Sequence, residues 1–173
     1  MSDVKRPRIL PLPEGEWDPR LDAVLVRLDQ VLNIHRVMAR NPELLAAWAP
    51  LRDHITAGGS LVPRHRELVI LRLAHRARSE YEWHHHAIRG QAAGLSETEV
   101  AAVRDVSTGE WTAIDAALLA ATDELFDTRS ISSPTWAVLA AELSQQQLLD
   151  VVVTVGVYMT LAMVIAVTGV SIE

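Results

Sequence analysis

The sequence predicts an all-α protein that folds as a helical bundle. Apolar residues recur at the three- and four-residue spacing of a helix face, and helix-capping patterns interrupt the chain at short intervals. No segment shows the sustained alternation of apolar and polar residues, bounded by hairpin turns, that indicates strands. Together these observations predict an architecture of packed helices.

The first part of the chain predicts an extended arm followed by a helix. Residues 1–19 are polar and rich in proline, and they lack the apolar core and the small-residue cleavage site of a signal peptide. We therefore expect an extended arm and a cytoplasmic protein. Residues 20–173 are predicted to form a single domain. Its first helix is expected over residues 21–32, where leucines and valines follow helical spacing.

Capping patterns predict where the other helices begin. Asn41 and Pro42 form an N-cap followed by proline at the first helical position, and Pro63 is expected to open another helix. Ser79 and Glu82 form a capping box, so the next helix should start near Glu80 and end at Gly94. Further starts are expected at four more patterns, around Ser96, Thr112, Ser133 and Ser144.

The segment from Val151 to Val170 contains no charged residue and is long enough to span a membrane. Its threonines and glycines dilute the apolar character, however, and no Lys or Arg flanks it to set an orientation in a bilayer. A helix that is apolar on all sides also suits the centre of a core or a subunit interface. We therefore expect a buried helix and no membrane partner.

Composition excludes several classes of function. The chain of 173 residues has a formal net charge of -6, which argues against nucleic acid as a partner because phosphate binding needs a basic surface. It contains no cysteine. Disulfides, thiolate nucleophiles, thiol peroxidase chemistry and cysteine-ligated metal centres are therefore all excluded for this chain.

The densest polar cluster lies at residues 79–86 and carries the candidate active site. Glu82 and His86 are four residues apart and share one helix face, while Glu67 lies on the preceding helix and reaches them if the two helices form a hairpin. Two carboxyl groups beside an imidazole suit acid–base catalysis, because crowding in a dry site raises the pKa of one carboxyl. We predict that Glu67, Glu82 and His86 are catalytic and that Tyr81, Trp83 and His85 contact a small-molecule substrate.

Simpler roles stay open for the same residues. In the simpler interpretation, Glu82 serves only as the reciprocal partner of the Ser79 cap. Glu67 is then a surface residue that forms an ion pair with Arg64 or Arg66. The three predicted catalytic residues also form a mixed nitrogen and oxygen set that suits zinc, iron or manganese. Because that set is incomplete in the sequence, we predict no metal and no other cofactor.

Four stretches of the chain form a recognisable pattern, at Asn41 to Leu45, Leu61 to Leu68, Glu80 to His86 and Ala92 to Ser96. Together they resemble the carboxymuconolactone decarboxylase and alkylhydroperoxidase D superfamily, over roughly residues 20–170. The resemblance implies a helical bundle of the alkylhydroperoxidase D-like type. It also implies a homo-oligomer, a trimer or hexamer, in which the uncharged last helix is buried.

The two branches of that superfamily imply different chemistry. In the alkylhydroperoxidase branch a glutamate precedes a Cys-x-x-Cys-x-x-x-His motif, which places the glutamate on Glu67, the histidine on His86 and the two thiols on Ser79 and Glu82. Since both thiols are missing, we do not expect a thiol peroxidase. The decarboxylase branch acts on lactone acids from aromatic-ring breakdown and needs no thiol.

The resemblance therefore implies a cofactor-independent lyase that decarboxylates, hydrates or isomerises a small lactone or keto acid by acid–base catalysis. Arg72 and Arg89 are candidate anchors for the carboxylate of such a substrate, or else surface residues. Two alternatives are kept. One is a non-catalytic binding or scaffold oligomer that lost its chemistry with its cysteines, and the other is a metalloenzyme built on Glu67, Glu82 and His86.

Overall fold

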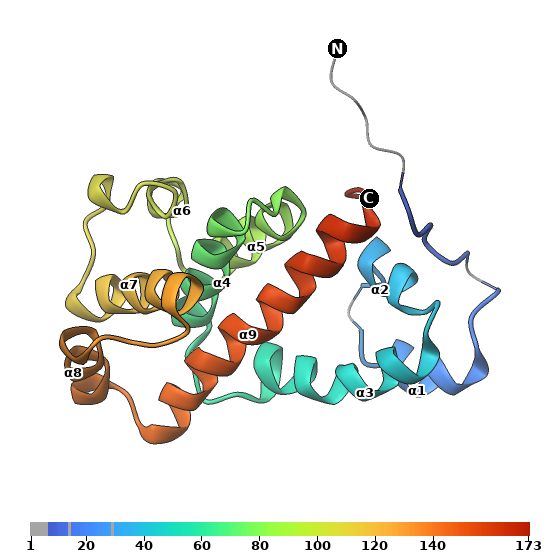
Figure 1. The fold of residues 1–173 in the computed structure, drawn as a ribbon, viewed down its shortest axis with the longest axis horizontal. Helices are drawn as coiled ribbons and strands as arrows, with labels where there is room; N and C mark the ends of the chain where they lie inside the picture. The colour runs from blue at the N-terminus through green and yellow to red at the C-terminus, as the bar shows by residue number, and fades with distance from the viewer. Residues whose placement is uncertain (1–6, 14, 29) are drawn as a thin grey trace, which may run out of the picture. The chain divides into compact units, whose positions relative to one another are not determined.

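The computed structural model describes residues 7–13, 15–28 and 30–173, and in these ranges it contains helices, turns and loops but no strand (Figure 1). The all-α prediction is confirmed for the described residues. The α-helices are α1 (Asp22–Leu25), α2 (Asn33–Met38), α3 (Pro42–Asp53), α4 (Pro63–Arg76), α5 (Glu80–Ala92), α6 (Glu97–Ala102), α7 (Ala113–Thr128), α8 (Ser133–Glu142) and α9 (Gln145–Thr168).

The chain divides into two compact units, residues 1–58 with 163–173, and residues 59–162. In the first unit the described part of the predicted arm bends at residues 8–9 and turns at residues 15–17, and its backbone is hydrogen-bonded to later segments. The Leu12 N–H donates to the Arg36 carbonyl at 3.0 Å, and the Arg8 N–H donates to the Thr168 carbonyl at 2.7 Å. Residues 1–6 and 14 of that arm lie outside the described residues. The domain boundary at residue 20 stays a prediction.

The helix predicted over residues 21–32 is wrong beyond its first turns. After a 3-10 turn at Pro19–Leu21 the described residues before Leu32 form only α1, and Val26 is exposed. Leu32 is buried, but it precedes α2 in an extended conformation. Apolar spacing reports which side chains are buried, and a turn can bury them as well as a helix can.

The later boundaries follow the capping patterns of the sequence. Asn41 accepts a hydrogen bond from the Leu44 N–H at 3.1 Å at the start of α3, and Ser96 and Glu99 form a complete capping box on α6. Gly94, with a φ of +96°, lies just beyond the end of α5. Only glycine adopts this conformation readily, so the predicted stop is confirmed.

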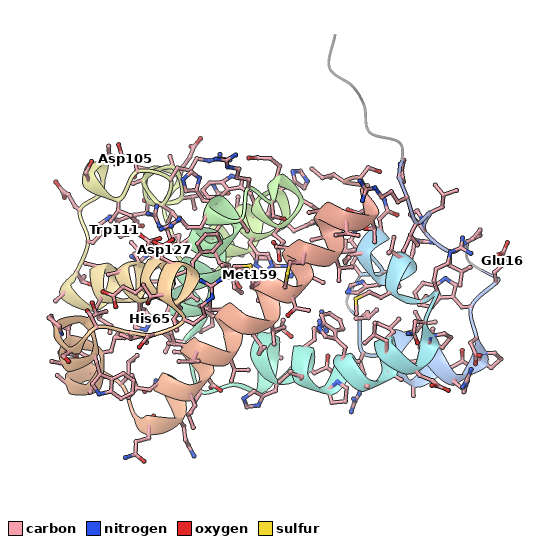
Figure 2. All side chains as sticks on the ribbon, in the orientation of Figure 1. Glu16, His65, Asp105, Trp111, Asp127 and Met159 are labelled. Carbon is pink, nitrogen blue, oxygen red and sulfur yellow. The ribbon has the colours of Figure 1, made fainter. Side chains whose placement is uncertain are left out.

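In the second unit α4 is the central helix and contacts both α5 and α7 (Figure 1). Consecutive residues from Glu67 to Leu71 are all buried on it, so that side chains on every face of this stretch meet protein. Figure 2 shows the side chains of the described residues on the ribbon, among them His65 on α4 and Asp127 on α7. The core cluster around α4 comprises Leu68, Leu71, Leu95, Val100, Val103 and Leu119.

Ion pairs fix the orientation of α4 against α7. Each pair joins an arginine of α4 to an aspartate 51 residues later on α7, namely Arg64 with Asp115 (2.9 Å), Arg72 with Asp123 (2.7 Å) and Arg76 with Asp127 (2.6 Å). A constant separation along the sequence means that the two helices run parallel. These ion pairs therefore fix the rotation of α4 about its own axis. They also fix the direction of the face of α4 that lies opposite α7.

The last helix, α9, is long and apolar enough to cross a membrane by length and composition, with a mean hydropathy of 2.3 in the relevant stretch. Within the described residues no other helix has both properties. Of that stretch, 39% is buried within this chain, and buried core helices of soluble proteins have the same composition.

Candidate active site

The hairpin of α4 and α5 brings Glu67 to His86. Only Ala77, Arg78 and Ser79 separate the two helices, and Arg78 takes a left-handed conformation with a φ of +55° to turn the chain back. Ser79 then caps α5 by accepting a hydrogen bond from the backbone N–H of Glu82 at 3.4 Å. This turn runs α5 back along α4, so that Trp83, near the turn, meets His75. One turn further along α5, His86 reaches Glu67.

A glycine allows the two helices to approach at the level of the site. Gly90 is buried, and a Cβ atom at this position would lie 3.0 Å from Leu95 Cδ1, 3.2 Å from Leu71 Cδ1 and 3.8 Å from Glu67 Cβ. The first two distances are tighter than ordinary van der Waals contact. The absence of a side chain at Gly90 therefore helps to set the spacing at which Glu67 faces α5.

The central contact of the site joins His86 Nδ1 to Glu67 Oε2 at 2.7 Å. Both side chains are buried, and the other carboxylate oxygen of Glu67, Oε1, accepts from Arg66 Nε at 3.1 Å. The ring of Tyr158, from α9, packs edge-on against the imidazole with its centroid 5.0 Å away. Among the described residues His86 Nε2 has no hydrogen-bond partner.

The protonation states of this pair follow from its surroundings. Burial alone raises the pKa of Glu67, but His86 and Arg66 together outweigh it, so the pKa of Glu67 lies below its ordinary value. Burial lowers the pKa of His86 more than Glu67 raises it. Near neutral pH the pair is therefore a carboxylate and a neutral imidazole. Nδ1 then carries the hydrogen that it donates to Glu67, which leaves the lone pair on Nε2.

Glu82 lies one helical turn before His86 and behaves in the opposite way. Its side chain is buried, and neither carboxyl oxygen has a hydrogen-bond partner among the described residues. Burial raises the pKa of Glu82 to about 8, and the nearby Ser79 hydroxyl opposes this only weakly, without reaching hydrogen-bonding geometry. Near neutral pH Glu82 is therefore mainly a neutral carboxylic acid, able to donate a hydrogen bond or a proton.

The role of Glu82 as a reciprocal cap, which the sequence left open, is wrong. The Ser79 hydroxyl caps α5, but the Ser79 N–H donates to the Ala74 carbonyl at 2.9 Å and not to Glu82. The surface role considered for Glu67 is also wrong, because Glu67 is buried even though it pairs with Arg66. Arg64 binds Glu99 and Asp115 instead.

The three residues predicted to contact substrate lie on other faces of α5. The Tyr81 and His85 rings pack against each other, with centroids 4.7 Å apart. Trp83 packs against the core cluster, and the Arg104 guanidinium lies over its ring at 3.9 Å. The role of these three residues in binding substrate stays a prediction.

Arginines separate into two groups around this site. Arg72 is committed to Asp123 and to the Val103 carbonyl, each at 2.7 Å, so it is not available as a substrate anchor. Arg66 and Arg89 both lie close enough to His86 to lower its pKa. The sequence placed Arg66 beside Glu67 without showing that the guanidinium is part of the buried site, since adjacency along a helix does not fix where a long side chain points.

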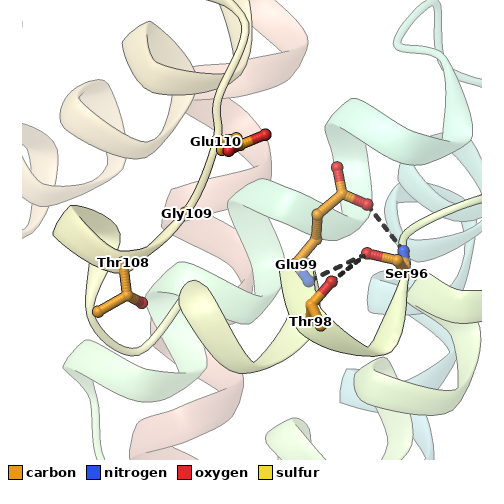
Figure 3. Close-up of a pocket in the computed structure, with 6 residues that line it drawn as sticks. All are labelled: Ser96, Thr98, Glu99, Thr108, Gly109 and Glu110. Carbon is orange, nitrogen blue, oxygen red and sulfur yellow. Dashed lines mark hydrogen bonds between the residues drawn. The ribbon is translucent and has the colours of Figure 1, made fainter.

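In the ranges that the structure describes, no three His, Asp or Glu side chains gather closely enough to hold a metal ion. The metalloenzyme alternative therefore has no ligand set there. A pocket of about 420 Å³ lies elsewhere in the same unit, lined by Ser96, Thr98, Glu99, Thr108, Gly109 and Glu110 (Figure 3). Glu99 in this pocket is already paired with Arg64 at 2.6 Å, and none of the three predicted catalytic residues lines it.

Comparisons with known proteins agree with the sequence pattern. The family model described as the carboxymuconolactone decarboxylase family matches residues 42–123, which include all three predicted catalytic residues. No curated protein matches the chain.

Solved structures show the same fold. A cysteine-to-alanine variant of the debrominase Bmp8, in complex with 2,3,4-tribromopyrrole, has a TM-score of 0.83 at 18% identity and covers 99% of this chain and 94% of its own. A peroxidase-related protein from a Silicibacter species has a TM-score of 0.80 at 17% identity, with 100% and 95% covered. A peroxidase-related protein from Ralstonia eutropha with an alkylhydroperoxidase core has a TM-score of 0.82 at 14% identity, with 96% and 92% covered.

Glu82 should make the stability of the protein depend on pH. In the folded state Glu82 holds its proton up to about pH 8, whereas an unfolded carboxyl loses it near 4.5. The stability from this group is therefore fully present below about pH 4.5 and is lost as the pH rises towards 8. Between pH 5 and pH 7 the Glu82 contribution should fall by about 2 to 3 kcal/mol.

Denaturant unfolding of the wild type and of Glu82→Gln at pH 5 and pH 7 measures this fall. The contributions of other titrating groups largely cancel when the free energy of unfolding of the variant is subtracted from that of the wild type. Glu80→Gln, which removes an exposed carboxyl from the same turn of α5, is the matched control and should show little pH-dependent difference. A wild-type to Glu82→Gln difference that is the same at pH 5 and pH 7 would show that Glu82 is ionised in the folded protein.

Proposed function

We propose that the chain is a cysteine-free member of the carboxymuconolactone decarboxylase and alkylhydroperoxidase D-like superfamily and a cofactor-independent acid–base enzyme acting on a small lactone or keto acid. One observation carries the proposal. Two buried groups on one face of α5 have opposite protonation, a neutral acid at Glu82 and a basic nitrogen at His86, and both lack a protein partner among the described residues.

In the proposed reaction His86 is the base. Its Nε2 removes a proton from the carbon next to the substrate carbonyl, and the electron pair of the broken C–H bond moves onto the carbonyl oxygen. The imidazolium that forms is stabilised by the Glu67 carboxylate, 2.7 Å from Nδ1. Glu67 thus acts through His86 by fixing its tautomer and balancing its charge.

Glu82 is the acid in this scheme. Its carboxyl proton passes to the oxyanion, so an enol forms in place of a buried charged enolate. Return of a proton from His86 to a different carbon, with return of the enol O–H proton to the Glu82 carboxylate, restores the carbonyl and completes an isomerisation. In a decarboxylation the C–C bond to the carboxylate breaks instead, carbon dioxide leaves, and the same oxyanion receives the Glu82 proton. Both reactions use only groups that the site contains.

Thiol peroxidase chemistry is not proposed. The chain has no cysteine, and the two positions that correspond to the thiols of the alkylhydroperoxidase branch are a helix cap, Ser79, and a buried carboxyl, Glu82. Neither group can form the disulfide through which that reaction cycles.

Turnover of small lactone and keto acids tests the proposal. Once a substrate is found, His86→Ala and Glu82→Gln should each lower kcat by a factor of about 100 to 10,000, because each removes a positioned acid or base. The value of kcat/KM should rise with pH as His86 loses its proton, and this rise should occur at a pH below the ordinary pKa of histidine. It should fall above about pH 8, where Glu82 ionises. His84→Ala, an exposed neighbour on α5, is the control and should keep wild-type turnover.

Unchanged turnover in His86→Ala would contradict the proposed mechanism, in which His86 is the base. Saturable binding without turnover across the whole panel would favour the alternative of a non-catalytic binding or scaffold oligomer.

We also propose that the chain assembles as a homo-oligomer, a trimer or hexamer, through α9. Within the second unit Leu149 is 66% exposed on this helix, and Val152 and Val153 are 40% and 37% exposed. Gly156 and Thr160 continue the exposed stripe at helical spacing. An apolar stripe with a small residue at its centre suits close packing against a helix of a second copy.

Sedimentation of the purified protein tests the assembly. The wild type should sediment as a trimer or hexamer, and Leu149→Glu should shift it towards smaller species because a carboxylate would be buried in the interface. Val138→Glu, on the exposed side of α8, is the control and should leave the mass unchanged. A wild-type protein that is monomeric at micromolar concentration would contradict the proposal.

A further inference from the structure

Arg66 is the most constrained arginine at the site and yet has unused hydrogen-bonding capacity. Only 17% of its side chain is exposed. Its Nε donates to Glu67 Oε1 at 3.1 Å, but among the described residues the terminal nitrogens, Nη1 and Nη2, have no partner. The terminal nitrogens are not fully buried, so they face solvent and are open to a ligand from outside the chain.

The free edge of the guanidinium has a definite shape. With Nε turned towards Glu67, the two terminal nitrogens present a planar pair of donors, which matches the two oxygens of a carboxylate. Arginines elsewhere on α4 show the contrast. Arg64 and Arg72 have their guanidinium groups bound to acidic side chains of this chain, whereas the terminal nitrogens of Arg66 are not.

The charge at the site also favours an anion. Arg89 lies one turn after His86 on α5, close enough to act on it electrostatically, and its side chain has no ion pair with any described residue. Arg66 and Arg89 contribute two positive charges, against the single negative charge of Glu67. A site with one net positive charge attracts a monoanion.

We propose that Arg66 binds the carboxylate of the substrate through its terminal guanidinium nitrogens, and that Arg89 adds positive potential beside it. The site is then selective for small carboxylate anions over their neutral esters. This inference rests on the proposed function, because it supplies the anchor for the acid on which His86 and Glu82 act. Arg66 joins the anchor to the base through Glu67, since Oε1 binds Arg66 and Oε2 binds His86.

The test uses 4-oxopentanoate, a small keto acid, and its methyl ester, which has nearly the same shape without the charge. Titration calorimetry on the whole protein should give an affinity for the acid that is about 10- to 100-fold higher than for the ester, as expected for a charge-assisted pair of hydrogen bonds. Arg66→Gln should lower the affinity for the acid to that for the ester and leave ester binding unchanged. Unchanged ester binding separates loss of the anchor from general damage to the site.

Two further variants sharpen the result. Arg78→Gln removes an exposed arginine of the same unit and should keep the wild-type preference. Arg66→Lys keeps the charge but loses the planar pair of donors, so it should retain only part of the preference. If Arg66→Gln weakens ester binding as well, Arg66→Lys is used to test the anchor. A preference for the acid over the ester in Arg66→Lys that is as large as in the wild type contradicts the proposal.

No preference for the acid in the wild type, or an undiminished preference in Arg66→Gln, overturns the anchor. These outcomes are separate from failure of the proposed function, because probe binding needs no turnover. If Glu82→Gln and His86→Ala keep full activity on a confirmed substrate while Arg66→Gln loses the charge preference, the anchor stands and the acid–base mechanism fails.

Discussion

The contact between Glu67 Oε2 and His86 Nδ1 joins α4 to α5 and fixes the chemistry of the site. It needs a short turn at residues 77–79, a close approach of the helices at Gly90 and an α4 that is held in direction by its ion pairs with α7. Once it is formed, one carboxyl of the site is ionised and one imidazole is neutral. Arg66 extends the same chain of contacts towards the surface.

Glu67 and Glu82 show how one residue type takes two protonation states within a single hairpin. Both side chains are buried, and burial alone raises the pKa of each. Glu67 meets a histidine and an arginine, which stabilise its charge, whereas Glu82 has no partner that does so. The difference lies in the neighbours and not in the carboxyls themselves, and it provides an acid and a base at the same pH.

The sequence predicted the helices well wherever a cap marked the start, as at Asn41, Ser79 and Ser96. It failed over residues 21–32, where only apolar spacing supported a helix and turns buried the same side chains. It placed Glu67 and His86 on neighbouring helices of a hairpin, and the structure brings these two side chains into contact. It could not decide whether Glu82 was a cap or a free acid, because that depends on where a flexible side chain points after packing. The free donors of Arg66 were hidden for the same reason.

The protonation state of Glu82 is the claim on which this account of the site depends most directly. Carbon-13 NMR of the glutamate side-chain carboxyl groups, recorded from pH 4 to pH 9 on the wild type and on Glu82→Gln, measures it without a substrate. One carboxyl signal should titrate near pH 8 in the wild type and be missing in Glu82→Gln. If every glutamate signal of the wild type has finished titrating by about pH 6, well above the ordinary range of carboxyl groups, Glu82 is ionised at neutral pH and cannot be the acid.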